Sequence, residues 1–193
     1  MASQQNTIDI RTATPTDANA IANIHVAAWR AAYINIVPQS HLDNLNTDDR
    51  VKLWQRILST PATATSILVA EDSDTEKSRL LGFVSFGPVA ATPSPGDKGN
   101  DEEGTEGQEK TAELRAIYIS PQHWTKGIGQ ALWKATQQQL LEEKFTSVVV
   151  KAFARNERAM RFYRAVGFEG EEMGVTEVGG ESLETAKMRK RLV

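Results

Sequence analysis

The stretch that most constrains the fold of this chain is "AELRAIYISPQHWTKGIGQALWK", which runs from Ala112 to Lys134. It predicts a strand over 112–120, a loop with two glycines, and a helix over 129–144. Several backbone N–H groups would then lie at a helix N-terminus, where the helix dipole and the unpaired donors favour an anion. Glycine suits such a loop because a Cβ would hold phosphates away from the backbone. The stretch therefore predicts an anion-binding turn.

The glycine loop fits neither of two well-known phosphate loops. The loop of nucleoside triphosphatases needs Lys and then Ser or Thr directly after its last glycine, whereas Gln130 and Ala131 follow Gly129. The dinucleotide-binding fingerprint needs a third glycine or an alanine where Leu132 stands. These two ligand classes are therefore not indicated.

The rest of the chain indicates a mixed α/β (α+β) fold. A capping hydroxyl at Thr14, followed by Pro15 and Asp17, marks a helix start. We expect strands over 7–13, 65–72, 79–89, 112–120, 147–153 and 182–193, and helices over 14–31, 47–58, 129–144 and 156–166. This order suggests a mixed sheet flanked by helices. At 193 residues, we expect a single domain over residues 1–193.

An acidic segment interrupts this pattern at about residues 90–111. Its residues 91–110 contain two prolines, four glycines and six acids against two lysines. Such a composition cannot bury enough apolar surface to offset the entropy of ordering its backbone. We expect a flexible, solvated insertion within one domain, which is either a passive loop or a regulatory tether.

Composition excludes several classes of function. The formal net charge of −3 argues against nucleic-acid binding by bulk electrostatics. The start "MASQQNTIDI" does not resemble a signal peptide and no apolar run is long enough to span a membrane, so we expect a cytoplasmic protein without a membrane partner. Cysteine is absent, which excludes a cysteine-linked covalent intermediate. The three histidines lie far apart, so we expect no metal site.

A second motif, "NERAMRFYRAVGF", follows the glycine loop at 156–168. The two together resemble the GNAT superfamily of acyl-CoA-dependent N-acetyltransferases. That superfamily carries Asn-x-x-Ala-x-x-Phe-Tyr-x-x-x-Gly-Phe, which this motif matches at every fixed position, about thirty residues after a loop of the form Arg/Gln-x-x-Gly-x-Gly/Ala. In the loop, Trp124 stands at the Arg/Gln position. "AWRAAYINIVPQSHLDNL" also resembles one branch of these enzymes, with Asn35 where glycine is usual.

The resemblance implies a GNAT-like mixed central sheet whose middle strands splay apart, flanked by helices on both faces. It implies transfer of an acetyl group from acetyl-CoA to a primary amine of a small molecule, by direct attack in a ternary complex. A homodimer is a further possibility that it raises. The residues that would bind the cofactor are Ile117, Ile119, Trp124, Thr125, Lys126, Gly127, Ile128, Gly129, Gln130, Asn156 and Arg158.

The resemblance also assigns catalytic roles. Glu113 would be a general base that acts through water, or else a polar residue at a strand start. Tyr163 would protonate the departing thiolate, since phenols and thiols have comparable pKa values of ~10 and ~8.5, or else serve the core. Trp29 and Tyr33 would border the acceptor pocket or pack inside. Protein N-termini or lysines remain alternative acceptors, and a catalytically silent acyl-CoA sensor remains an alternative function.

Overall fold

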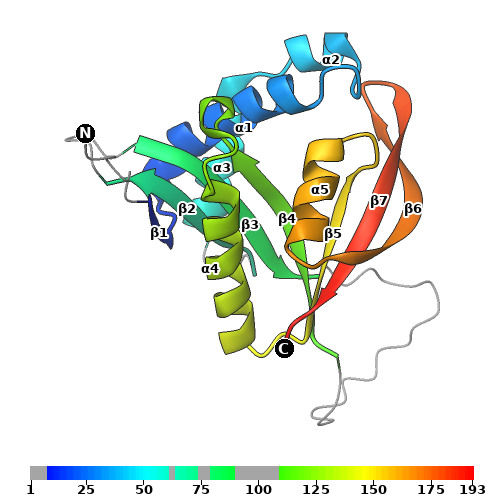
Figure 1. Ribbon diagram of the computed structural model, residues 1–193. Coiled ribbons are helices and arrows are strands. Elements are labelled where there is room, and N and C mark those ends of the chain that lie inside the picture. Colours follow the sequence, from blue (N-terminus) through cyan, green and yellow to red (C-terminus); the bar gives the residue numbers. More distant parts are fainter. Residues whose placement is uncertain (1–7, 61–63, 74–78, 90–108) are drawn as a thin grey trace, which may run out of the picture.

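The computed structural model describes residues 8–60, 64–73, 79–89 and 109–193 (Figure 1). Most of the segment expected to form the acidic insertion lies outside these residues. The described strands form one seven-stranded sheet in the order β1-β2-β3-β4-β5-β7-β6. Their bounds are Ile8–Thr12 (β1), Ser66–Asp72 (β2), Arg79–Pro88 (β3), Thr111–Ile119 (β4), Ser147–Phe153 (β5), Glu169–Val178 (β6) and Glu181–Arg191 (β7). Among these described strands, only β4 and β5 pair in parallel.

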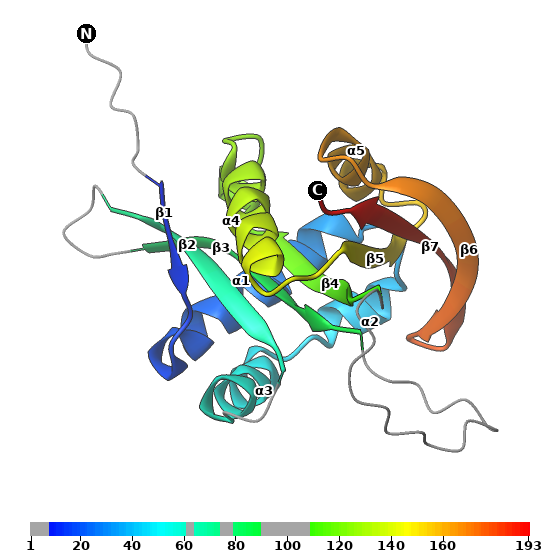
Figure 2. The ribbon, with the colours of Figure 1, turned by 90° about the horizontal axis from the view of Figure 1, so that it is seen from below.

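Helices cover both faces of the sheet, as the sequence predicts. Their bounds are Ala18–Ala32 (α1), Gln39–Asp43 (α2), Thr47–Ser59 (α3), Ile128–Glu142 (α4) and Glu157–Ala165 (α5), with short 3-10 turns at Pro15–Asp17 and Pro121–His123. Figure 2 shows α4 and α5 on one side of the sheet and α1, α2 and α3 on the other. The mixed α/β architecture is thus confirmed.

The beginning of the first helix follows from its polar residues. The backbone N–H of Thr14 donates to the Asp17 carboxylate at 2.7 Å, which closes the turn before α1. Arg11 on β1 donates to the same carboxylate at 2.8 Å and to Glu71 on β2 at 3.0 Å. One guanidinium therefore joins the first two strands to the start of α1.

Two elements were not expected from the sequence. The short helix α2 contributes only Leu42 to the interior, which is too little for a helical pattern to stand out. Strand β6 is exposed along most of its length and contains four glutamates, two glycines and no alternation of polar and apolar residues. It forms because β7 supplies its hydrogen-bond partners over a long antiparallel hairpin, closed by Gly179 and Gly180.

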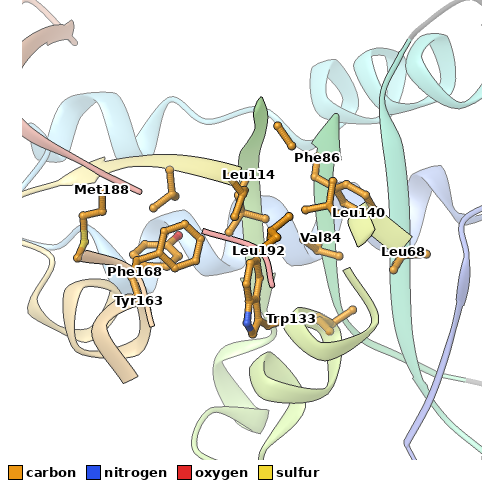
Figure 3. Packing of buried hydrophobic residues seen from close by; sticks show 14 of the residues in the cluster. Leu68, Val84, Phe86, Leu114, Trp133, Leu140, Tyr163, Phe168, Met188 and Leu192 are labelled. Atoms are coloured by element: carbon orange, nitrogen blue, oxygen red, sulfur yellow. The ribbon is translucent and has the colours of Figure 1, made fainter. Parts of the chain in front are cut away.

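The larger core lies between the sheet and the helices α4 and α5. Phe168 and Tyr163 pack edge to face there, with ring centroids 5.6 Å apart, beside Met188 of β7 (Figure 3). Trp133 of α4 adds a second ring against Phe168, at 5.1 Å. A smaller core joins α1 and α3 to the other face, around Trp54 and Phe83. Tyr163 is therefore a structural residue as well as a candidate functional residue.

The feature that positions the site is a split in the middle of the sheet. Strands β4 and β5 pair only from Thr111 to Leu114 and from Ser147 to Val150. Beyond these residues β4 continues along β3, and β5 continues along β7. The register against β3 skips Arg115, which forms a β-bulge at the vertex of the split. A bulge bends its strand, so it turns β4 away from β5.

Candidate active site

A cavity of about 570 Å³ lies at the split between β4 and β5. Its walls come from β4, from the loop before α4, from α5 and from α1, so it reaches both faces of the sheet. Most of the residues expected to bind a cofactor line it: Ile117, Ile119, Trp124, Thr125, Gly127, Ile128, Gly129, Gln130, Asn156 and Arg158. Lys126 does not line the cavity.

The loop before α4 has the conformation that an anion cradle needs. Thr125 and Gly127 both have left-handed backbones, with φ of 66° and 79°. Alternating left-handed residues turn successive N–H groups toward one side. The first N–H groups of α4 have no acceptor inside the helix, and those from Thr125 to Gln130 have no other backbone acceptor among the described residues. A Cβ built on Gly127 would meet nothing within 4 Å, so the space before the loop is open.

The second glycine serves packing rather than backbone geometry. A Cβ on Gly129 would lie 3.3 Å from the Phe162 ring of α5. The absence of a side chain at Gly129 therefore lets α4 and α5 approach at the mouth of the cavity. Gly127 thus allows the backbone conformation of the loop, whereas Gly129 allows the close packing of α4 and α5.

Trp124 replaces the usual Arg or Gln of the loop, and its indole is held in place on both sides. Its Nε1–H donates to the carbonyl oxygen of Ile119 at 3.0 Å. The Arg158 guanidinium lies over the ring, 3.5 Å from its centroid, a cation–π arrangement that contributes about 0.5–2 kcal/mol. The stack places a positive charge beside the open N–H groups of the loop. Arg158 thus supplies the charge that Trp124 lacks.

Asn156 and Tyr163 come from the second motif. The Asn156 carboxamide oxygen accepts a hydrogen bond from the Ala159 N–H at 3.2 Å and caps α5, while the residue also lines the cavity. Burial, with a smaller effect from Tyr118, raises the pKa of Tyr163 above its ordinary value. A tyrosine phenol is neutral at physiological pH even at its ordinary pKa of ~10, so the hydroxyl holds a proton that it can donate, and the raised pKa makes it a weaker acid than a free phenol. Its hydroxyl has no hydrogen-bond partner among the described residues.

Aromatic residues form the wall on the α1 side. Tyr33 and Tyr118 line the cavity, whereas Trp29 lies behind them and its Nε1–H donates to the Tyr118 hydroxyl at 3.0 Å. The rings of Trp29 and Tyr33 meet edge to face at 4.8 Å. Burial raises the pKa of both tyrosines. Trp29 thus orients the wall instead of touching the cavity.

Glu113 lies on β4 but does not line the cavity. Its carboxylate oxygen is 3.6 Å from Nε of Arg115, and its side chain is about one third exposed. Arg115 does line the cavity, as do Lys151 and His123. The pKa of His123 is lowered by burial and by the charges of Lys126 and Arg79. Its buried Nδ1 has no hydrogen-bond partner among the described residues.

Sequence reasoning did not single out Arg115, Lys151, Tyr118 or His123. Lys151 carried a usable signal, because it is the lone charge in the apolar strand "SVVVKAF". Tyr118 lies between Ile117 and Ile119, so its side chain points to the other face of β4. Only the face with the two isoleucines was expected to contribute to the site. Arg115 and His123 gave no signal, since only the bulge and the 3-10 turn place them at the cavity.

Two further findings concern metal ligands and membrane-spanning helices among the described residues. They contain no group of three or more His, Cys, Asp or Glu side chains that could hold a metal ion. No described helix is long and apolar enough to cross a membrane.

Known proteins resemble the chain in sequence and in structure. The model of the acetyltransferase (GNAT) family matches residues 21–168. The uncharacterized N-acetyltransferase YuaI of Bacillus subtilis (strain 168) is 30% identical over 158 residues, which cover 82% of this chain and 78% of YuaI.

Solved structures share the fold at lower sequence identity. NAA60 of Arabidopsis thaliana, solved with a bisubstrate analogue, has a TM-score of 0.71 and 17% identity, covering 97% of this chain and all of its own. YncA of Salmonella typhimurium, solved with its cofactor acetyl-CoA, has a TM-score of 0.64 and 22% identity, covering 97% of this chain and 95% of its own.

Proposed function

Because the chain belongs to the GNAT family of acetyltransferases, we propose that it moves an acetyl group from acetyl-CoA to the primary amine of a small molecule. The observation that carries the proposal is the cavity at the β4–β5 split, with an open N–H cradle at one end and a neutral phenol inside. Acetyl-CoA would supply an acetyl thioester, which the amine attacks as the carbon–sulfur bond breaks.

The residues of the loop fit the phosphates of the cofactor. The N–H groups around Gly127 would bind the pyrophosphate, since they lack other backbone partners and the helix dipole adds positive potential. Arg158 would add a charge-assisted hydrogen bond from its stack on Trp124. Gly127 leaves the room that a Cβ would fill. The backbone groups of Ile117 and Ile119 would hold the pantetheine arm along the free edge of β4.

We propose that the two proton transfers are carried out by Tyr163, which lines the cavity, and Glu113, which lies beside it. Tyr163 would donate its phenolic proton toward the departing thiolate, for which its unpartnered hydroxyl is suited. Glu113 would take a proton from the amine. A water molecule would have to carry this proton, because the Glu113 carboxylate lies outside the cavity beside Arg115. Neutral Tyr33 and Tyr118 are poor bases, and they would instead shape the acceptor side.

A small acceptor is supported by what covers the α1 side. The tip of the β6–β7 hairpin lies against α2, where a Cβ on Gly179 would be 2.9 Å from the His41 side chain. Val178 and Leu183 of this hairpin pack into the same cluster as Tyr33. We propose that this packing beside Tyr33 limits the approach of an acceptor from the α1 side, which suits a metabolite better than a folded protein.

The proposal is tested by incubating the protein with acetyl-CoA and a panel of small amines and peptides, and following thiol release. We expect release with small amines. CoA binding without release on any acceptor would support a silent sensor, and release only with peptides would support the alternative acceptor.

The base role of Glu113 needs its own variant. We expect Glu113→Gln to lower kcat by about 100-fold and to leave the affinity for CoA unchanged. An unchanged kcat and pH profile would rule out the base role while leaving acetyl transfer intact.

A further inference from the structure

The cavity is cationic although the chain as a whole is acidic. Its charged lining residues are the cations Arg115, Lys151, Arg158 and Arg161, and no Asp or Glu lines it among the described residues. The whole chain carries a formal net charge of −3. Two of these cations are paired with carboxylates outside the cavity, Arg115 with Glu113 and Arg161 with Glu157, whereas Lys151 and Arg158 form no salt bridge among the described residues. The remaining positive charge at the site favours anionic ligand groups.

These cations form two pairs at different places. Arg158 and Arg161 lie on α5, with Arg158 stacked beside the glycine loop. Arg115 and Lys151 directly follow the last residues that pair β4 with β5, so they flank the vertex of the split. Four residues of β4 separate Arg115 from the loop end of the strand, about 13 Å at the usual rise. The phosphates of a cofactor in the cradle would explain the positive charges of Arg158 and Arg161, but not those of Arg115 and Lys151.

Lys151 lies on the α1 side of the sheet. Residues two apart on a strand share a face, and Phe153, two residues further, packs edge to face on Tyr33 at 5.0 Å. Lys151 is exposed and forms no salt bridge among the described residues. Its cross-strand neighbour Lys187 is paired with Glu172 at 3.5 Å. Lys151 is thus the cation of the vertex that is available to a ligand.

Arg115, in contrast to Lys151, is held by hydrogen bonds to the protein. Its guanidinium donates to the Thr65 hydroxyl at 2.8 Å and to the Pro88 carbonyl at 2.7 Å, and it lies near Glu113. These contacts fix it in place. It adds positive potential at the vertex, while Lys151 keeps free donors.

The walls beside this pair are apolar and small. Ala28 and Ala32 of α1 and Ala116 and Ala152 of the split strands all line the cavity. Small apolar side chains leave room for an acceptor, and they lower the local polarity, which strengthens the attraction between opposite charges.

We propose that the acceptor is an amine that carries its own anionic group, as a free amino acid does, and that Lys151 binds this anion. The inference rests on the proposed function and narrows its substrate class. The anion would anchor the acceptor at the vertex, on the α1 side of the cavity. The surrounding positive charge also disfavours an ammonium ion, so a bound amine loses its proton more readily and becomes nucleophilic.

The test compares matched acceptors with saturating acetyl-CoA. Each L-amino acid is paired with its decarboxylated amine, for example phenylalanine with phenethylamine and methionine with 3-(methylthio)propylamine, and with the corresponding 1-aminoalkylphosphonate. We expect kcat/KM for the best anionic acceptor to exceed that of its decarboxylated partner by roughly tenfold or more, as for a hydrogen bond to a charged group. The phosphonate arm separates a site for carboxylates from one for tetrahedral anions.

Variants then identify the residue. Lys151→Met should lower kcat/KM for the anionic acceptor by roughly 10- to 100-fold, mainly by raising KM. The same variant should leave kcat/KM for the decarboxylated amine unchanged. Lys151→Arg should retain most of the activity. Lys187→Met is the matched control, because Lys187 lies opposite on β7, is exposed and does not line the cavity; it should behave as wild type.

The outcomes separate this inference from the proposed function. Equal or better turnover of decarboxylated amines would overturn the anionic acceptor and leave acetyl transfer standing. Equal effects of Lys151→Met on both members of a pair would overturn the role of Lys151. Binding of CoA without thiol release on any acceptor would overturn both.

Discussion

At the scale of single residues, burial decides which groups of this protein can exchange protons. Tyr163 is buried in the large core and its pKa is raised, so it remains a neutral donor beside the cavity. His25 is buried under α3, where its Nδ1 accepts from the Trp54 Nε1–H at 3.2 Å. Burial, with a smaller effect from Arg50, lowers the pKa of His25 to about 4. One group is proposed for catalysis, and the other affects stability.

Removal of the Tyr163 hydroxyl should separate chemistry from binding. We expect Tyr163→Phe to lower kcat by about 100-fold, the range of a lost general acid. The affinity for CoA should stay within about twofold of wild type, because the ring and its packing on Phe168 remain. Steady-state kinetics and calorimetric titration with CoA measure the two effects. A variant with wild-type kcat would contradict the assigned role.

His25 should make the fold sensitive to mild acid. Below its ordinary pKa of 6.5 the unfolded chain binds a proton that the folded chain, with a pKa of about 4, does not. Stability is therefore lost as pH falls through the window from about 6.5 to 4. The loss between pH 7 and pH 5 should be about 2 kcal/mol.

Urea unfolding at the two pH values measures this loss. His25→Gln is the control, because it cannot titrate and should show a smaller difference between pH 7 and pH 5. An equal difference in both proteins would show that other groups cause the acid sensitivity.

At the scale of elements, the loop between β4 and α4 combines backbone strain with an open space. The left-handed conformation of Gly127 costs a residue with a Cβ about 1–2 kcal/mol. The same Cβ would project into space that no protein atom occupies within 4 Å. The proposed cradle for phosphates would account for this conformation beside empty space.

Gly127→Ala should therefore affect both stability and binding. We expect a loss of about 1–2 kcal/mol in the free energy of unfolding, and an affinity for CoA lowered by roughly tenfold or more, since the cradle depends on close backbone approach. Gly180→Ala is a matched control, because Gly180 also has a positive φ of 84° and open space at its Cβ, but lies at the β6–β7 turn. It should lose similar stability and keep its CoA affinity. Equal CoA affinities in both variants would argue against the cradle.

At the scale of the whole molecule, the cavity joins parts that are distant in sequence. Helix α1, both split strands and α5 all contribute walls, and the strands hold together only over a short paired segment. A ligand that fills the split would replace the interactions that β4 and β5 do not make with one another. Binding and global stability should therefore be linked.

This linkage predicts a large thermal shift with CoA. At a CoA concentration of 100 times Kd, the free energy of unfolding should rise by about 2.7 kcal/mol, which raises Tm by roughly 5–10 °C for a chain of this size. Differential scanning fluorimetry over a range of CoA concentrations measures the shift. A Tm that is independent of CoA concentration would contradict the proposed cofactor.

Much of this fold could be predicted from local sequence patterns. The strand, glycine loop and helix of 112–144 were expected nearly with their observed bounds, because apolar periodicity and glycine act locally. The match of 156–168 to the second motif singled out Asn156 and Tyr163, and both line the cavity. The strand β6 was missed, because a partner strand stabilises it and its own residues give no alternating pattern.

The sequence by itself determined the secondary structure around the candidate site and the family to which the chain belongs. Only the tertiary structure decided which residues reach the cavity. It set Trp29 and Glu113 outside the cavity, and it brought Arg115 and Lys151 to the vertex of the split. The reason is physical: a helix or a turn forms from neighbours in the chain, whereas the split depends on where two distant strands stop pairing, and no local pattern records that point.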